Sequence, residues 1–192
     1  MTLIEYMLIL RPHDELRARI MQVKKEFAEQ YQAPQANWIK PHVLLARFTQ
    51  YKMAEERILN RLRHVAMGFR PFKAELKDFG SYPSHTLFIP LISQEPVRAL
   101  LKQMKSFRQL LTIDKDHKPY FTDEPQVMIA NKLLPWQYEK GWLEYSHRHF
   151  TGRFIAGGML LLEREEGEKA WQIREALEFK GLAVDTVQGD LF

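Results

Sequence analysis

The chain carries one short pattern twice: Pro41-His42-Val43-Leu44-Leu45-Ala46-Arg47 and Pro125-Gln126-Val127-Met128-Ile129-Ala130-Asn131. Each copy begins with proline and continues as an apolar, partly β-branched run, which is typical of a buried strand. We therefore predict a first motif strand over 41–49 and a second over 125–131. If the two halves of the chain are related by a pseudo-twofold axis, the two strands line one cleft.

Side-chain alternation assigns a face to each residue of these strands. His42 and Leu44 point to one side of the first strand, and Gln126 and Met128 share a side of the second. The same rule predicts that Arg47 lies on the face opposite His42, outside the cleft.

The remaining periodicity alternates between strands and helices. Apolar runs predict further strands at 2–10, 72–79, 86–92, 154–163 and 170–179, and helical spacing predicts helices at 15–31, 52–67, 95–111 and after Pro135. This order predicts an α+β chain with two similar halves, and we expect one bilobal domain over 1–192. The last dozen residues suggest a loose tail or an arm for a partner.

Composition limits the classes of function. The 192 residues carry a net charge of +4 and no cysteine, which excludes disulfides, thiolate metal sites and cysteine nucleophiles. The N-terminal strand has no basic leader, and no apolar run reaches the length of a membrane span. We expect a cytoplasmic protein with no membrane partner, whose weak positive charge permits a polyanionic partner without requiring one.

The two motif strands carry a resemblance to a known family, together with the Phe79-Gly80-x-x-Pro83 turn and the closing apolar strand. The chain resembles the 2H phosphoesterase superfamily, which includes 2'-5' RNA ligase and cyclic phosphodiesterase-like proteins. That resemblance implies a two-lobed, pseudo-symmetric fold, with antiparallel sheets lining a central cleft and helices outside. It also implies a His-x-Thr/Ser pair in each lobe, acting on a phosphodiester without metal or cofactor.

The family pattern transfers to this chain only in part. His42 matches the first catalytic histidine, whereas Gln126 replaces the second, and Leu44 and Met128 replace the two hydroxyl residues. A glutamine amide donates and accepts hydrogen bonds but does not exchange a proton near neutral pH. The family's standard mechanism therefore cannot run with these residues. Gln126 is left as a candidate for substrate binding.

Two tyrosines and four histidines are further candidates for the same site. Tyr6 and Tyr120 could stack on a base, although such tyrosines more often belong to the core or the rim. Four histidines could substitute for the lost one, and each is better explained as a strand-end, loop or helix-end residue: His85, His117, His147 and His149. The His147-x-His149 pair lacks a carboxylate cluster at ligand spacing, so we predict no metal site.

Three functions are compatible with the sequence. The first is a protein with a degraded site that binds a nucleotide or an RNA phosphate end, with weak or no hydrolysis. The second is an active, divergent cyclic phosphodiesterase or RNA phosphoesterase that uses His42. The third is a non-catalytic module whose apolar cleft, around Leu44 and Met128, packs against another protein.

Overall fold

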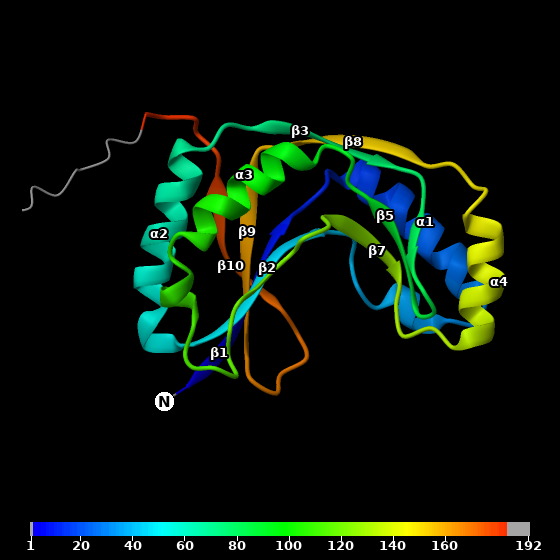
Figure 1. Ribbon diagram of the computed structural model, residues 1–192, viewed down its shortest axis with the longest axis horizontal. Coiled ribbons are helices and arrows are strands. Elements are labelled where there is room, and N and C mark those ends of the chain that lie inside the picture. Colours follow the sequence, from blue (N-terminus) through cyan, green and yellow to red (C-terminus); the bar gives the residue numbers. More distant parts are fainter. Residues whose placement is uncertain (1, 184–192) are drawn as a thin grey trace, which may run out of the picture.

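The computed structural model describes residues 2–183, which form two lobes joined through the middle of one long sheet (Figure 1). The strands are β1 (Leu3–Leu10), β2 (Val43–Tyr51), β3 (Phe72–Lys77), β4 (Gly80–Tyr82), β5 (Thr86–Pro90), β6 (Tyr120–Phe121), β7 (Gln126–Ala130), β8 (Thr151–Ala156), β9 (Gly158–Glu165) and β10 (Gln172–Glu178). The α-helices are α1 (Asp14–Gln30), α2 (Glu55–Gly68), α3 (Gln94–Lys105) and α4 (Pro135–Tyr145). Short 3-10 helices are η1 (Pro34–Asn37), η2 (Lys52–Ala54) and η3 (Arg108–Leu111).

The long sheet runs in the order β10-β9-β1-β2-β7-β5-β4, and β6 also pairs with β2. All of its registers are antiparallel. The motif strands β2 and β7 are neighbours at its centre, where Val43 lies opposite Val127. β3 and β8 form a separate antiparallel pair. The two copies of the sequence pattern therefore meet where the lobes meet.

Two helices cross between the lobes and create the pseudo-symmetry. α1 connects β1 to β2, yet it packs on β7 and β8 of the other lobe. α3 connects β5 to β7, yet it packs against α2, on the lobe of β1 and β2. Figure 1 shows α2 and α3 flanking one lobe and α1 and α4 flanking the other. The expected two-lobed α+β fold, with antiparallel sheets and helices outside, is confirmed.

Local sequence explains where the helices begin. His13 caps α1, because its Nδ1 accepts the backbone N–H of Leu16 at 3.2 Å. Pro135 opens α4 at the first position, where its missing N–H costs nothing. The predicted helices at 52–67 and 95–111 each include a 3-10 segment as well as an α-helix, so their α-helical parts are shorter than expected.

The prediction of a single strand at 154–163 is wrong, because two strands cover this range. The chain forms β8, paired with β3, and then β9, paired with β1 and β10. Burial alternates on even numbers at Phe154 and Ala156 but on odd numbers at Met159 and Leu161. This change of phase marks the point where the chain leaves one sheet for the other. A Cβ on Gly158 would lie 2.5 Å from the Leu177 carbonyl oxygen, so β10 approaches too closely for a larger residue.

Within residues 2–183, no helix is long and apolar enough to cross a membrane. The tail proposed for the last dozen residues lies largely outside the described residues, because positions 184–192 are not among them.

Candidate functional site: the motif face of the central sheet

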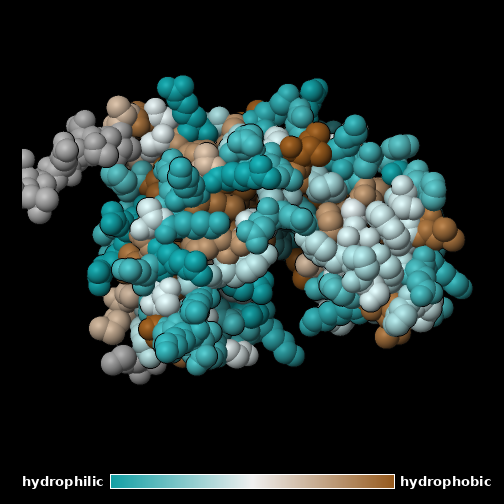
Figure 2. All heavy atoms as spheres, in the orientation of Figure 1, coloured by the Kyte–Doolittle hydropathy of each residue, from teal (hydrophilic) through white to brown (hydrophobic). Residues whose placement is uncertain are grey.

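The register between β2 and β7 assembles the four motif positions on one face. Residues directly opposite each other in an antiparallel pair point to the same side of the sheet. Because Val43 opposes Val127 and both are buried, the flanking residues His42, Leu44, Gln126 and Met128 point to the other side. We call this side the motif face, and Figure 2 shows a hollow between the two lobes.

His42 is half-buried and immediately precedes β2. Its Nδ1 lies 2.8 Å from the Lys40 carbonyl oxygen. Since a carbonyl oxygen only accepts, Nδ1 carries the proton in the neutral ring and Nε2 keeps its lone pair. Burial lowers the pKa of His42, the contact with Lys40 opposes this, and the positive charges of Lys24 and Arg47 lower it further. At neutral pH the site therefore offers a neutral imidazole that can accept a proton.

A buried cation lies next to the motif strands. Lys24 on α1 is only 1% exposed, and its Nζ donates to the Met128 carbonyl oxygen at 3.0 Å. The Pro125 carbonyl accepts from Leu91, beside β5, so by alternation the Met128 carbonyl points toward β2. Burial lowers the pKa of Lys24 to about 8, which leaves the ammonium mostly charged at neutral pH. Lys24 was not predicted as a site residue, although the sequence has it on the same helical stripe as Ile20, Val23 and Phe27.

Gln126 has a defined orientation. The Tyr82 hydroxyl on β4 lies 3.2 Å from Gln126 Oε1 and donates to Glu124 Oε2 at 2.7 Å. Burial and the Glu124 carboxylate raise the pKa of Tyr82 to about 12, so the phenol stays protonated. Because Tyr82 has one phenolic proton and the shorter contact is to Glu124, the Gln126 amide can still offer a ligand its oxygen as an acceptor and its NH₂ group as a donor. Sequence reasoning did not identify Tyr82 or Glu124.

The two positions that replace the hydroxyls, Leu44 and Met128, are half-buried apolar side chains. Met128 lies opposite Phe88 on β5, and Phe88 in turn lies opposite Gly80 on β4. A Cβ at Gly80 would come within 2.5 Å of the Phe88 ring, so glycine allows that ring to cover β4. This part of the motif face packs by apolar contact and offers no side-chain donor.

Tyr6 was wrong as a candidate for base stacking. It is 0% exposed, stacks on Phe48 with ring centroids 5.1 Å apart, and donates to Glu55 Oε2 at 2.9 Å. Glu55 belongs to α2, so Tyr6 points to the helix side of the sheet. The even-numbered residues of β1 are buried on the helix side, so only odd-numbered residues of β1 point to the motif face. The faces of β1 were not predicted from the sequence, and the ion pair of the buried Glu55 with Arg174 could not be seen from spacing.

The prediction for Arg47 was also wrong, because β2 contains a bulge. The register passes from Ile9 opposite Leu44 to Leu8 opposite Ala46, so Leu45 has no partner. One extra residue reverses the alternation beyond it. Arg47 therefore shares the motif face with His42. Tyr120 lies directly opposite Arg47 on β6, so it belongs to the same face.

The four histidines considered as substitutes each contact another group. His85 Nδ1 is 2.6 Å from Thr86 Oγ1, and His117 Nδ1 is 2.9 Å from Asp114 Oδ1. His147 Nδ1 lies 3.0 Å from the Leu143 carbonyl, and His149 Nδ1 lies 3.3 Å from Asp78 Oδ1. In the part of the chain that the structure describes, none of their hydrogen bonds reaches a motif residue.

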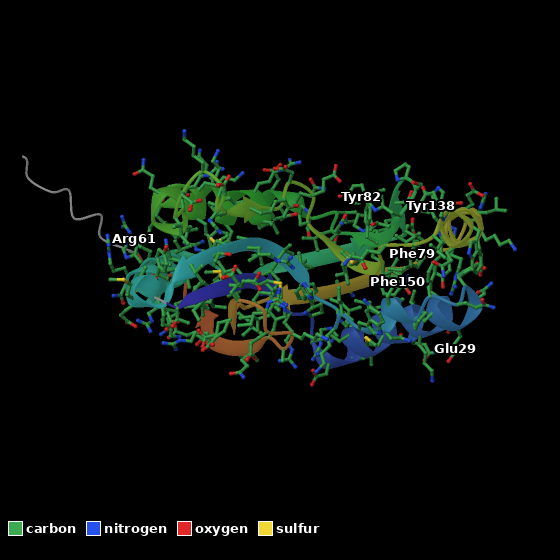
Figure 3. The ribbon with its side chains drawn as sticks, turned by 90° about the horizontal axis from the view of Figure 1, so that it is seen from below. Glu29, Arg61, Phe79, Tyr82, Tyr138 and Phe150 are labelled. Carbon is green, nitrogen blue, oxygen red and sulfur yellow. The ribbon has the colours of Figure 1, made fainter. Side chains whose placement is uncertain are left out.

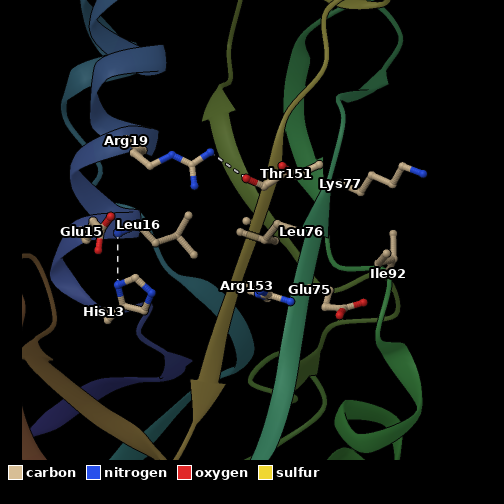
Figure 4. A pocket seen from close by; sticks show the side chains of 11 residues that line it. His13, Glu15, Leu16, Arg19, Glu75, Leu76, Lys77, Ile92, Thr151 and Arg153 are labelled. Carbon is tan, nitrogen blue, oxygen red and sulfur yellow. Dashed lines mark hydrogen bonds between the residues drawn. The ribbon is translucent and has the colours of Figure 1, made fainter.

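A cavity of about 720 Å³ lies away from the motif face, between the first turns of α1 and the β3–β8 pair (Figure 4). Its charges are mixed, with Arg19 and Arg153 near Glu15 and Glu75, and the Arg19 guanidinium already donates to the Thr151 carbonyl at 2.7 Å. Among residues 2–183, no group of three or more histidines and carboxylates could hold a metal ion. The motif face thus carries one neutral imidazole, one amide and the exposed Arg47 cation, and the buried Lys24 ammonium lies next to its strands.

This fold and site define a class, that of two-lobed proteins whose paired motif strands meet at a central cleft. The sequence model of the 2'-5' RNA ligase superfamily matches residues 12–168, and the chain belongs to this superfamily. No sequence among the curated proteins matches.

Solved structures agree on the fold. TT0787 of Thermus thermophilus superposes with a TM-score of 0.68 at 16% identity, covering 92% of this chain and 98% of its own. E. coli LigT complexed with 3'-AMP gives 0.61 at 12% identity, covering 92% and 99%. Kluyveromyces marxianus Usb1 gives 0.51 at 12% identity, covering 91% and 97%. At these identities, the likeness concerns the fold alone.

Proposed function

We propose that this protein works as one bilobal unit that binds a nucleotide or an RNA phosphate end on the motif face, with weak or no hydrolysis. The observation that carries the proposal is that His42 and Gln126 share one face of the sheet on neighbouring strands, one on either side of the Val43–Val127 pair. Of the four motif positions, only His42 titrates near neutral pH. E. coli LigT, a structural relative, has been solved with 3'-AMP, with phosphate and with ATP.

Three groups support anion binding. The Gln126 NH₂ can donate to an anion, the Lys24 ammonium contributes positive potential next to the motif strands, and His42 can receive a proton when a phosphate approaches. Glu124, at the rim, opposes an anion. We therefore expect moderate affinity, with the phosphate nearer to His42 than to Tyr82.

Catalysis lacks its second proton-transfer group. Removing one positioned acid or base typically costs ~10²–10⁴-fold in rate. Leu44 and Met128 also remove the two donors expected to hold the phosphate oxygens in the reaction. Binding can survive these losses better than turnover, because the amide and the cations still act on the ground state.

A second function is favoured by one observation, the state of His42. Its Nδ1–H tautomer leaves Nε2 with a lone pair, and its lowered pKa keeps the ring unprotonated at neutral pH, so His42 can act as a general base. An active phosphoesterase would use His42 Nε2 to take a proton from the attacking hydroxyl or water. The leaving oxygen would then be protonated by solvent.

The test uses a 2',3'-cyclic nucleoside monophosphate, with binding followed by calorimetry and ring opening by chromatography, for wild type and His42→Ala. We expect binding that weakens in His42→Ala, and ring opening at the same low rate in both proteins. Ring opening that disappears in His42→Ala would favour the active enzyme. No binding at millimolar ligand would refute the proposal. The remaining function would then be the non-catalytic module that packs its apolar cleft against another protein.

A further inference from the structure

The bulge in β2 places a charged residue further along the motif face. Leu45 is the unpaired residue, so Leu44 and Arg47 point the same way although they are three positions apart. The Cα atoms of His42 and Arg47 are separated by about four strand steps, or ~13 Å along the strand, although the Arg47 charge still lowers the pKa of His42. A group bound at His42 and a group bound at Arg47 are therefore separate parts of a ligand.

Arg47 is an exposed cation on the motif face. Its side chain is exposed, its Nη2 lies 3.7 Å from the Met7 sulfur, and its guanidinium lies 6.0 Å from the centroid of the Trp171 ring. Among the residues that the structure describes, no carboxylate forms an ion pair with it. Arg164, whose guanidinium lies 4.4 Å from the centroid of the same ring, is in contrast paired with Glu5. Arg47 is therefore available to an external anion.

An exposed aromatic ring lies beside this cation. Tyr120 on β6 is opposite Arg47 in the register and is 54% exposed. Its neighbour Phe121 points to the helix side, where Lys105 of α3 lies 5.8 Å from the ring centroid. Tyr120 thus keeps its ring on the motif face, at the cross-strand position beside Arg47. A cation with an adjacent exposed ring is the combination by which proteins bind the backbone and base of single-stranded nucleic acid.

We propose that Arg47 and Tyr120 form a second nucleotide subsite, so that the cleft takes a single-stranded oligoribonucleotide rather than a mononucleotide. The terminal phosphate lies at His42, the base of a neighbouring nucleotide stacks on Tyr120, and Arg47 contacts that nucleotide's phosphate. The assignment rests on the proposed function for the terminal phosphate, and the experiment separates the two.

The experiment compares two probes that share one end, a 2',3'-cyclic mononucleotide and a trinucleotide ending in the same cyclic phosphate. Binding is measured at pH 8, where His42 is neutral, at several salt concentrations. The variants are Arg47→Ala, Tyr120→Ala and Tyr120→Phe. The matched control is Arg61→Ala, which removes an exposed cation on α2 at the far end of the long axis from Tyr82 (Figure 3).

We expect the trinucleotide to bind more tightly than the mononucleotide. Tyr120→Ala should weaken trinucleotide binding by about 5- to 100-fold, and Tyr120→Phe should retain most of the affinity, because the ring supplies the stacking. Arg47→Ala should weaken it as well and reduce the salt slope by about 0.7, the value for one phosphate of a single strand. The Arg47 and Tyr120 variants should bind the mononucleotide with an affinity within about twofold of wild type. Arg61→Ala should bind both the mononucleotide and the trinucleotide within the same range.

Equal affinity for the two probes, or unchanged trinucleotide binding in Arg47→Ala and Tyr120→Ala, would overturn the second subsite and leave the terminal phosphate site intact. Trinucleotide binding that depends on Arg47 and Tyr120 but not on His42 would support the second subsite and refute the phosphate site. Absence of binding by both probes would refute both.

Discussion

The two sides of the motif face differ in charge and in chemistry. The β2 side carries His42 and Arg47, one neutral base and one exposed cation. The β7 side carries Gln126 and Met128, with Glu124 at its rim. Yet Val43 and Val127, on the opposite face, pair and pack alike. The comparison teaches that the strand frame depends on its buried residues, so the fold persists where the chemistry of one side has been replaced.

The most direct way to remove the difference is to restore the missing motif residues on both strands. The variant Leu44→Thr/Gln126→His/Met128→Thr would supply both hydroxyls and a second imidazole, and all three positions are only half-buried, which makes them tolerant of exchange. We expect ring opening of a 2',3'-cyclic phosphate to rise by ~10²–10⁴-fold over wild type. Adding His42→Ala should return the rate to the wild-type level. A folded triple variant whose ring-opening rate does not exceed that of wild type would show that residues outside these positions also prevent catalysis.

The second prediction concerns Lys24, the buried cation next to the two motif strands, and the free energy of unfolding that its burial costs. Its pKa falls from 10.5 to about 8 in the folded chain, so the unfolded chain binds more protons between these values. The free energy of unfolding should therefore rise with pH across this window, by at most about 3 kcal/mol for a shift of this size. Urea titrations at pH 8 and pH 10.5 measure it, as the difference between wild type and Lys24→Met.

The same variant should raise the pKa of His42, because the Lys24 charge lowers it in the wild type. A proton NMR titration of the imidazole measures this shift. An unchanged His42 pKa, or the same pH dependence of stability in both proteins, would contradict the proposed position of the ammonium.

Tyr6→Phe distinguishes the helix side of the sheet from the motif face. The hydroxyl donates to the buried carboxylate of Glu55, whose pKa is lowered to about 2 because hydrogen bonds from Lys52, Arg174 and Tyr6 outweigh its desolvation. Loss of a bond to a charged group should cost about 1.5–3 kcal/mol of unfolding free energy. Ligand affinity should not change. Weaker nucleotide binding without loss of stability would return Tyr6 to the site.

Gln126→Ala has the smallest expected effect. It removes one neutral donor, which is worth about 1 kcal/mol, so mononucleotide affinity should fall by roughly fivefold. Calorimetry with the cyclic mononucleotide measures this change, and Lys132→Ala serves as the control, an exposed cation just beyond β7. An affinity that rises in Gln126→Ala would instead assign the residue to blocking the site.

Much of the fold was predictable, because burial imposes its period directly on the sequence. The strands containing Val43 and Val127, and the helix opened by Pro135, were predicted within a few residues. The predictions failed where one extra residue reverses the alternation of side chains along a strand. The bulge at Leu45 moved Arg47 to the motif face, and the shift after Gly157 divided one expected strand between two sheets.

The sequence by itself determined the two motif strands and the residues at the four motif positions. Among these four, only His42 titrates near neutral pH, whereas Leu44, Gln126 and Met128 replace the expected residues. Residue identity and short periodicity are local properties, which is why the sequence suffices for them. Only the tertiary structure decided that β2 and β7 are neighbours, that Tyr6 is buried against Glu55, that Lys24 reaches the Met128 carbonyl and that Arg47 lies beside Tyr120. These relations depend on register and on helices that cross between lobes, which bring together residues far apart in the chain. Alternation along one strand cannot specify them.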